Sequence, residues 1–252
     1  MPPSNRIHIG TSGWNYKHWK GPFYPEDIPA KQWFDHYAKN FHTVEINRTF
    51  YRLPEPETFE QWRRNALEGF FFSLKASRYI THVKKLKDPL QPVSDFMERA
   101  GRLKEKLGPV LFQLPPRWKC NPERLGAFLK VLPENRRYAL EFRDDTWWNS
   151  EVYEILRSHN VAFCTFHLAG VLSPLEITAD FAYIRLHGPG DAYQGSYDEN
   201  SLSQWADQIG QWRAEGLEIY IYFDNDEKGH APRDALRLLA KVNSRNSQAP
   251  HP

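Results

Sequence analysis

The stretch Phe181-Ala-Tyr-Ile-Arg-Leu-His-Gly-Pro-Gly190 says more about the fold than any other part of the chain. An apolar run of strand length reaches Arg185 and His187 and then stops at a Gly-Pro-Gly turn. Successive side chains of a strand point to opposite faces, so Tyr183, Arg185 and His187 share one face. Several other apolar runs in the chain end in the same way, in a same-face polar residue followed by a loop.

Apolar runs of strand length alternate with amphipathic segments of helix length. This alternation implies parallel strands joined by right-handed crossovers. Eight predicted strands favour an α/β fold closed into a TIM-type (β/α)8-like barrel, which leaves no sheet edge. An open doubly wound sheet is the alternative, but no glycine fingerprint follows the first strand. The predicted strands are Arg6–Ile9, Thr43–Ile46, Phe70–Lys75, Val110–Leu114, Tyr138–Phe142, Val161–Phe166, Phe181–Leu186 and Leu217–Phe223.

The helices between these strands are predicted from their apolar periodicity. In the segment 201–215, Leu202, Trp205, Ile209 and Trp212 fall on one face of a helix with 3.6 residues per turn, so the two tryptophans are expected in the core. The predicted helices are Lys31–Lys39, Thr58–Leu67, Val93–Leu107, Pro122–Val131, Ser150–Ser158, Ser201–Glu215 and Ala231–Val242.

Length and composition are those of one globular domain. The chain has 252 residues, the size of one α/β barrel. Its net charge of +2 indicates neither nucleic acid nor an anionic membrane as a partner. No apolar run approaches the roughly 20 residues that span a bilayer, and the first residues lack a signal-peptide pattern. Cys120 and Cys164 have no metal or redox spacing. We expect a cytoplasmic single domain over 1–252, with a core over 6–242 and a disordered tail over 243–252.

Four charged residues lie inside predicted strands, between apolar neighbours: Glu45, Lys75, Glu141 and Arg185. Burying a charge without a partner costs several kcal/mol, so we expect these four to pair with one another or with a ligand around one cavity. One interpretation is a salt-bridge network that plugs the barrel top. The other is a ligand site at the C-terminal barrel mouth, where the active sites of such barrels form. Insertions over 10–29 and 76–92 would overhang this mouth and favour the second interpretation.

The residues at the mouth allow acid–base chemistry and anion binding. Glu45 and Glu141 form a candidate acid–base pair whose pKa values neighbouring cations would separate, and a histidine could carry protons near neutral pH. Arginine forks at the strand ends suit phosphate or carboxylate groups. We predict catalytic roles for Glu45, Lys75, Glu141 and His187. The predicted ligand-binding residues are Ser12, Trp14, Asn47, His82, Gln113, Arg143, Trp147, His167, Arg185, Tyr222, Asp224 and Asn225.

Metal and cofactor signals are weak. Carboxylate and imidazole groups at the mouth are suitable ligands for Zn or Mn, but no His-x-x-x-His or comparable spacing occurs and several cations crowd the same region. No phosphate-binding P-loop and no Gly-x-Ser-x-Gly nucleophile elbow is present. We assign no metal ligands and no cofactor.

Short motifs occur along the chain in a characteristic order. They are Gly10-Thr-Ser-Gly-Trp14, Glu45-Ile-Asn47 with Phe50-Tyr51, Phe72-Ser-Leu-Lys75, Thr81-His82, Gln113-Leu-Pro-Pro116, Glu141-Phe-Arg143 with Trp147, Tyr183-Ile-Arg-Leu-His-Gly188 and Tyr222-Phe-Asp-Asn225. Together they resemble the YecE-like family, domain of unknown function 72, over about residues 6 to 242. The resemblance implies a TIM-like barrel with the mouth described above, and no established activity. Asp224 departs from the asparagine expected there, and His167 stands where the sixth strand often ends in aspartate.

Three functions are compatible with these residues. The first is an enzyme, a hydrolase or isomerase, that acts on a phosphorylated or polyhydroxylated ligand. The second is a nucleic-acid-binding or processing protein, similar to endonuclease IV in shape only. It is suggested by basic residues on loops, which are Lys84, Lys85, Lys87, Arg117 and Lys119. The third is a non-catalytic small-ligand sensor that uses the same pocket. The expected partner is a small anionic or polyhydroxylated molecule, with nucleic acid as the alternative and no membrane.

Overall fold

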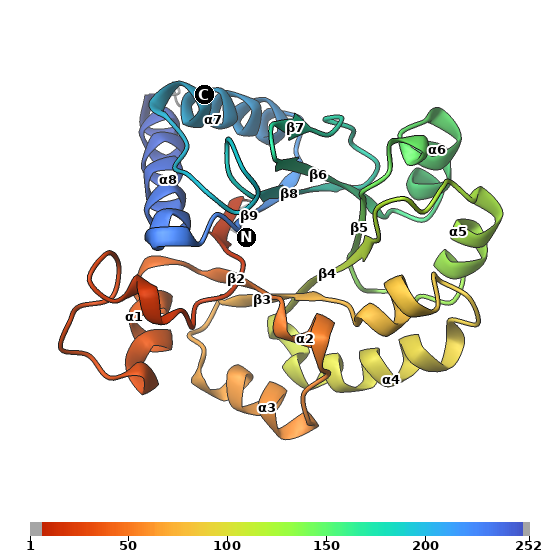
Figure 1. Ribbon diagram of the computed structural model, residues 1–252, viewed down its shortest axis with the longest axis horizontal. Coiled ribbons are helices and arrows are strands. Elements are labelled where there is room, and N and C mark those ends of the chain that lie inside the picture. Colours follow the sequence, from red (N-terminus) through yellow and green to blue (C-terminus); the bar gives the residue numbers. More distant parts are fainter. Residues whose placement is uncertain (1–6, 249–252) are drawn as a thin grey trace. The chain divides into compact units, whose positions relative to one another are not determined.

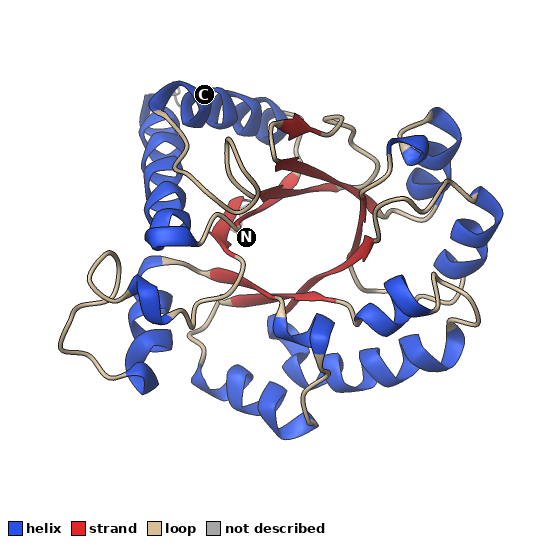
Figure 2. Cartoon of the chain, in the orientation of Figure 1, coloured by secondary structure: helices blue, strands red, loops and turns tan. Residues whose placement is uncertain are grey.

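The computed structural model describes residues 7–248, which fold as a TIM-type (β/α)8-like barrel. The strands, red in Figure 2, follow the hydrogen-bonded order β1-β9-β8-β6-β5-β4-β3-β2, and a short strand, β7, pairs with β6. All eight predicted strands are present. Their bounds are β1 Ile7–Thr11, β2 Thr43–Ile46, β3 Phe71–Lys75, β4 Leu107–Leu114, β5 Tyr138–Phe142, β6 Ala162–Leu168, β8 Phe181–Leu186 and β9 Glu218–Phe223, with β7 at Val171–Leu172.

The strands are buried along nearly their whole length. Every residue of β5 and of β8 is buried, as expected for parallel strands covered on both faces. Residues Glu141 and Arg185 therefore lie in the interior although they carry charge, and each is fully buried. A buried charge needs a partner close by. The candidate site is therefore sought among the side chains that surround these two residues.

The chain divides into two compact units, which we describe in turn. Among the described residues, the first unit contains 7–44, 165–173 and 180–248, and the second contains 45–164 and 174–179. The predicted single domain over 1–252 stays a prediction.

In the first unit, helices α7 and α8 lie side by side (Figure 1), and both pack on β9. Helix α7 (Glu199–Ala214) buries Leu202, Trp205, Ile209 and Trp212, as predicted. Helix α8 (His230–Gln248) continues past the expected end at Val242, so the predicted disorder over 243–248 is wrong, and the rest of the expected tail lies outside the described residues. The other helical elements of this unit are α1 Trp33–Asn40, η1 Lys17–Trp19, η2 Ala30–Gln32 and η6 Glu227–Gly229.

In the second unit, side-chain caps fix the start of two helices. The Asn121 side chain accepts a hydrogen bond from the Arg124 amide (2.9 Å) at α5, and Asn149 accepts one from the Val152 amide (3.1 Å) at α6. Three short elements were not predicted: the helix α2, the π-helical turn η3 and the 3-10 helix η5. The elements are α2 Arg48–Tyr51, α3 Pro56–Asn65, η3 Tyr79–Val83, α4 Leu90–Ala100, η4 Gly101–Lys106, α5 Pro122–Leu129, η5 Asp145–Trp147 and α6 Ser150–Ser158.

One further property concerns membranes. Within residues 7–248, none of the helices combines the length and the apolar character needed to cross a bilayer.

Candidate functional site

Three buried polar side chains meet at the carboxyl ends of β8 and β9 in the first unit. The guanidinium Nη2 of Arg185 donates to Asp224 Oδ2 at 3.1 Å, and His187 Nδ1 lies 3.0 Å from the same oxygen. Arg185 Nη1 lies 3.2 Å from His187 Nε2. Arg185 and His187 are fully buried, and Asp224 is 7% exposed. The register explains the grouping, because Arg185 pairs with Tyr222 on β9 and His187 and Asp224 follow two residues later on their strands.

This geometry determines which nitrogen of His187 carries its proton. A guanidinium has only donors, so His187 Nε2 must accept from Arg185. The proton of a neutral imidazole then sits on Nδ1, which lies 3.0 Å from Asp224 Oδ2, close enough for electrostatic attraction but without the alignment of a hydrogen bond. Asp224 thus accepts a hydrogen bond from Arg185 and lies close to His187 Nδ1, and its negative charge balances the positive charge of Arg185.

The loop after β8 adds a second histidine to the same unit. Gly188 has φ +116°, and a Cβ there would lie 2.2 Å from the Gln194 carbonyl oxygen, so only glycine fits this turn. Its amide donates to the Tyr197 hydroxyl at 3.1 Å, and that hydroxyl lies 3.1 Å from His167 Nδ1. Burial lowers the pKa of His167, which favours the neutral ring. The hydrogen bond between the Tyr197 hydroxyl and Nδ1 fixes the position of this ring.

Asn225 is held in one orientation by a buried aspartate. Its Nδ2 donates to Asp234 Oδ2 at 2.9 Å and to the Gly195 carbonyl at 2.8 Å. Both partners are acceptors, so the amide cannot be flipped. Its Oδ1 is buried and accepts no hydrogen bond from any residue that the structure describes. A buried acceptor of this kind is a place for a ligand or water donor.

In the second unit, Glu141 is the centre of a cluster on β5. One of its carboxylate oxygens accepts a hydrogen bond from Arg143 Nε, two residues along the same strand face, and the other lies 3.8 Å from the thiol of Cys164. Gln113 on β4 is the register partner of Glu141. Arg143 is therefore in contact with Glu141, and Gln113 lies beside it in the sheet.

A second cluster of this unit surrounds Phe50 on α2. The Lys75 ammonium lies 4.4 Å from the Phe50 ring centroid, a cation–π contact, and the ring of His82 meets Phe50 edge-on at 4.9 Å. Burial and the nearby cations Lys75 and Arg78 lower the pKa of His82. The Oδ1 of Asn47 is buried with no hydrogen-bond partner in the described chain. Glu45 on β2 is fully buried.

The placement of Trp147 differs from the prediction. It was expected on a loop, where its face could stack on a ligand, but it is fully buried. Its indole N–H donates to the Trp118 carbonyl at 2.6 Å and its ring stacks on Phe142 at 5.0 Å. Trp147 lies at the end of η5, where its ring fills the core beneath the loop. It is a packing residue.

The remaining predicted residues lie in the first unit. Ser12 is buried, and its carbonyl accepts the Tyr16 hydroxyl at 2.7 Å. Trp14 is half-buried with its ring 5.2 Å from that of Phe34. The Tyr222 hydroxyl lies 2.7 Å from Thr43 Oγ1, inside the strand layer. The convergence of Glu45, Lys75, Glu141 and Arg185 around one cavity stays a prediction.

Two residues that hold predicted site residues in place were not found from the sequence, Tyr197 and Asp234. Both are fully buried or nearly so, and both hold residues that were predicted. A buried aspartate early in an amphipathic helix is a signal that could have indicated Asp234. In the described part of the chain, no group of three or more His, Cys, Asp or Glu side chains is arranged to hold a metal ion.

A parallel barrel with buried ionisable side chains at its strand ends defines a TIM-barrel protein with a polar strand-end site. The chain belongs to the family described as "Protein of unknown function DUF72", whose model matches residues 8–252. It is similar to UPF0759 protein YunF of Bacillus subtilis, with 23% identity over 92% of this chain and 93% of that protein. UPF0759 protein YecE of Escherichia coli K12 is 31% identical over 54% of this chain and 48% of its own length. A solved DUF72 family protein from Thermotoga maritima is 30% identical, with TM-score 0.86 over 94% of this chain and 99% of that one.

Proposed function

We propose that this protein is an enzyme, a hydrolase or isomerase, that acts on a phosphorylated or polyhydroxylated ligand at the carboxyl ends of its strands. The observation that carries the proposal is the buried group of Arg185, His187 and Asp224. A buried arginine beside a histidine whose tautomer is determined supplies both an anion-binding fork and a proton-transfer group.

The geometry couples binding to acid–base chemistry. In the structure the Nε2 lone pair of His187 is occupied by Arg185 Nη1. A ligand oxyanion that replaced Nε2 as the acceptor of this N–H would free the lone pair. His187 would then be able to take a proton from the ligand while the Asp224 carboxylate, 3.0 Å from Nδ1, stabilises the charged ring. The base would thus become available only when an anion is bound.

Glu141 is the second proton-transfer group that we propose. It is a fully buried carboxylate whose one oxygen is engaged by the neighbouring Arg143. A positioned carboxylate of this kind contributes about 10²–10⁴-fold to a proton-transfer step. We therefore expect Glu141→Gln, which keeps the shape of the side chain, to abolish turnover while the protein melts normally.

The proposal is tested by screening sugar phosphates, nucleotides and neutral sugars for thermal stabilisation and then for turnover. A ligand at 100 times its Kd adds about 2.7 kcal/mol of stability, which corresponds to roughly 5–11 °C in a chain of this size. The variant Glu134→Gln, the same chemical change at an exposed residue of the second unit, is the control and should leave turnover unchanged.

The outcomes separate the candidate functions. Turnover that is lost in Glu141→Gln and in His187→Gln but kept in Glu134→Gln supports the enzyme. Turnover that survives Glu141→Gln rejects the assignment of this residue. A ligand that stabilises the protein and is never converted identifies a sensor.

A further inference from the structure

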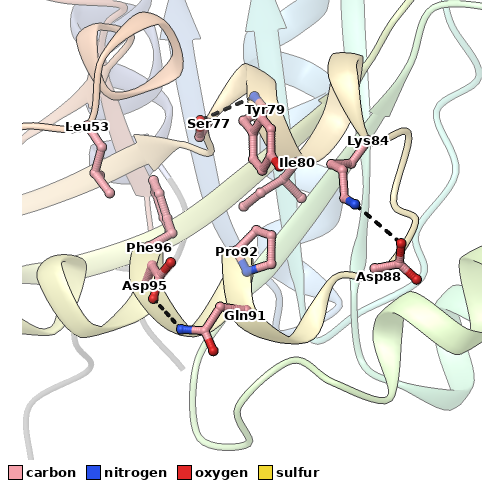
Figure 3. A pocket seen from close by; sticks show the side chains of 10 residues that line it. All are labelled: Leu53, Ser77, Tyr79, Ile80, Lys84, Asp88, Gln91, Pro92, Asp95 and Phe96. Carbon is pink, nitrogen blue, oxygen red and sulfur yellow. Dashed lines mark hydrogen bonds and ion pairs between the residues drawn. The ribbon is translucent and has the colours of Figure 1, made fainter.

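A surface pocket of about 460 Å³ lies in the second unit, between η3 and α4. Figure 3 shows side chains of the 77–84 segment facing those of α4 across it, with Leu53 at one side. The walls are apolar and the rim is polar, which is the composition of a small-ligand pocket, and the volume falls in the same range. The walls are Leu53, Tyr79, Ile80, Pro92 and Phe96, and the rim is Ser77, Lys84, Asp88, Gln91 and Asp95.

The backbone beside this pocket is irregular. The turn η3 is π-helical, and it is followed by Lys85, Leu86 and Asp88 with φ of 47°, 61° and 45°. The Leu86 amide donates to the Ile80 carbonyl at 3.0 Å, and the Leu86 side chain is buried. These two contacts hold the strained loop in one backbone conformation. Both π-helical turns and left-handed non-glycine residues concentrate at functional sites.

Five exposed cations lie in the two segments 48–53 and 77–88, each of which contributes residues to the pocket. Arg78 lies between the pocket residues Ser77 and Tyr79, and Arg52 precedes Leu53. The two segments are in contact, since Phe50 and His82 meet at 4.9 Å. These cations make no ion pair with any described residue, unlike Lys84, which is paired with Asp88 at 3.2 Å. The five are Arg48, Arg52, Arg78, Lys85 and Lys87.

Large apolar side chains are exposed on the same surface. Tyr51 is 73% exposed, Tyr79 is 50% exposed and Val83 is 61% exposed. Tyr79 contributes to the pocket wall and also presents half of its surface to solvent. Exposed tyrosines among unpaired cations are the features that bind stacked bases and phosphates.

We propose that this surface binds single-stranded nucleic acid, with one base entering the pocket against Tyr79 and the backbone following the cations of α2 and the η3 loop. An acidic peptide would satisfy the cations, but it offers a planar group only where it carries an aromatic side chain, whereas every nucleotide carries one. An anionic membrane would attract the cations, but a flat surface leaves a 460 Å³ concavity unfilled. A nucleotide provides both the planar apolar ring and the negative charge. Ser77, Gln91 and Asp95 on the rim then offer hydrogen-bond partners to the base edge.

The probe is a fluorescently labelled single-stranded oligonucleotide of about 12 nucleotides, measured by anisotropy at low salt on the full chain. Tyr79→Ala removes the ring on which one base would stack, so it is expected to weaken binding roughly 5- to 100-fold. Tyr79→Phe keeps an aromatic ring and is expected to retain binding. The Tyr79 backbone hydrogen bonds do not involve its side chain, so the fold should be kept.

Charge variants test the path of the backbone. Arg78→Gln and Lys85→Gln should each weaken binding and reduce the slope of log affinity against log salt by about 0.7. Lys130→Gln is the matched control, because Lys130 is an exposed cation of the same unit at the end of α5, outside the pocket surface. It should leave both affinity and slope unchanged.

The proposal is overturned if no oligonucleotide binds at low salt, or if Lys130→Gln weakens binding as much as Arg78→Gln. It is also overturned if vesicles with anionic lipid, or polyglutamate, bind with the same dependence on Tyr79 as the oligonucleotide. It does not rest on the proposed enzymatic function, so we expect Glu141→Gln to bind the oligonucleotide as the unaltered protein does.

Discussion

Replacement of Asp234 by alanine is expected to destabilise the first unit strongly. Asp234 is fully buried on α8 and accepts four hydrogen bonds from three segments. Its Oδ2 accepts from the Tyr197 amide and from Asn225 Nδ2, both at 2.9 Å. Its Oδ1 accepts from Ser196 Oγ at 2.6 Å and from Arg237 Nη1 at 2.9 Å.

The magnitude follows from which donors lose their only acceptor. Arg237 keeps Glu199 and the Tyr197 carbonyl as partners, and Asn225 keeps the Gly195 carbonyl. The Tyr197 amide is left buried without a partner, which costs about 1–3 kcal/mol, and the lost bonds to the carboxylate add a similar amount. We expect a loss of about 3 kcal/mol, or roughly 6–12 °C in melting temperature for a chain of this size.

The assay is thermal and urea unfolding of Asp234→Ala beside Asp234→Asn and Asp198→Ala. The asparagine keeps one acceptor oxygen and should lie between the alanine variant and the unaltered protein. Asp198 is the exposed N-cap of α7 and accepts the Ser201 amide at 2.7 Å, so its loss should cost about 1 kcal/mol. Faster exchange of the Tyr197 amide proton is expected in Asp234→Ala. The reasoning is refuted if Asp234→Ala melts within about 2 °C of the unaltered protein or above Asp198→Ala.

Two further predictions concern the loop after β8 and the response to pH. Gly188→Ala should lower the melting temperature clearly, since its Cβ would clash with the Gln194 carbonyl. Gly190→Ala is the control, because a Cβ there meets nothing within 4 Å, and it should not lower the melting temperature. Equal melting temperatures of the two variants would contradict the clash. Burial lowers the pKa of His82 and of His167, so the unfolded chain binds protons more readily and stability should fall as the pH drops below about 6.5. Urea unfolding across this range should show a shallower pH slope in His167→Gln than in the unaltered protein, and an unchanged slope would count against the assignment.

Much of the fold could be predicted because both periodicities are clear in the sequence. The strands β2, β5 and β8 have the predicted bounds, since each is an apolar run flanked by loop residues. The hairpin of β6 and β7 was missed because β7 has two residues and its turn is Ala169-Gly170, not the Asn-Gly pair that is typical of such turns. Helix α2 was missed for a similar reason, since four residues show no periodicity.

The candidate site was predictable in position and not in its contacts. Alternation along β8 placed Arg185 and His187 on one face, and the structure confirms that they touch. Alternation could not show that Trp147, which follows the end of β5 by five residues, turns inward onto Phe142. It could not identify Tyr197 and Asp234 either, because their roles depend on partners 30 or more residues away.

The chemistry of the β8–β9 strand ends depends on a detail that no sequence pattern contains, the position of one proton. With Arg185 donating to Nε2, the lone pair of this nitrogen is occupied, and under the function that we propose His187 becomes a base only when that N–H finds another acceptor. Had the arginine donated to Nδ1 instead, the proton of a neutral ring would sit on Nε2. The presence of arginine, histidine and aspartate is therefore a property of the sequence, whereas the nitrogen that carries the ring proton is a property of the fold.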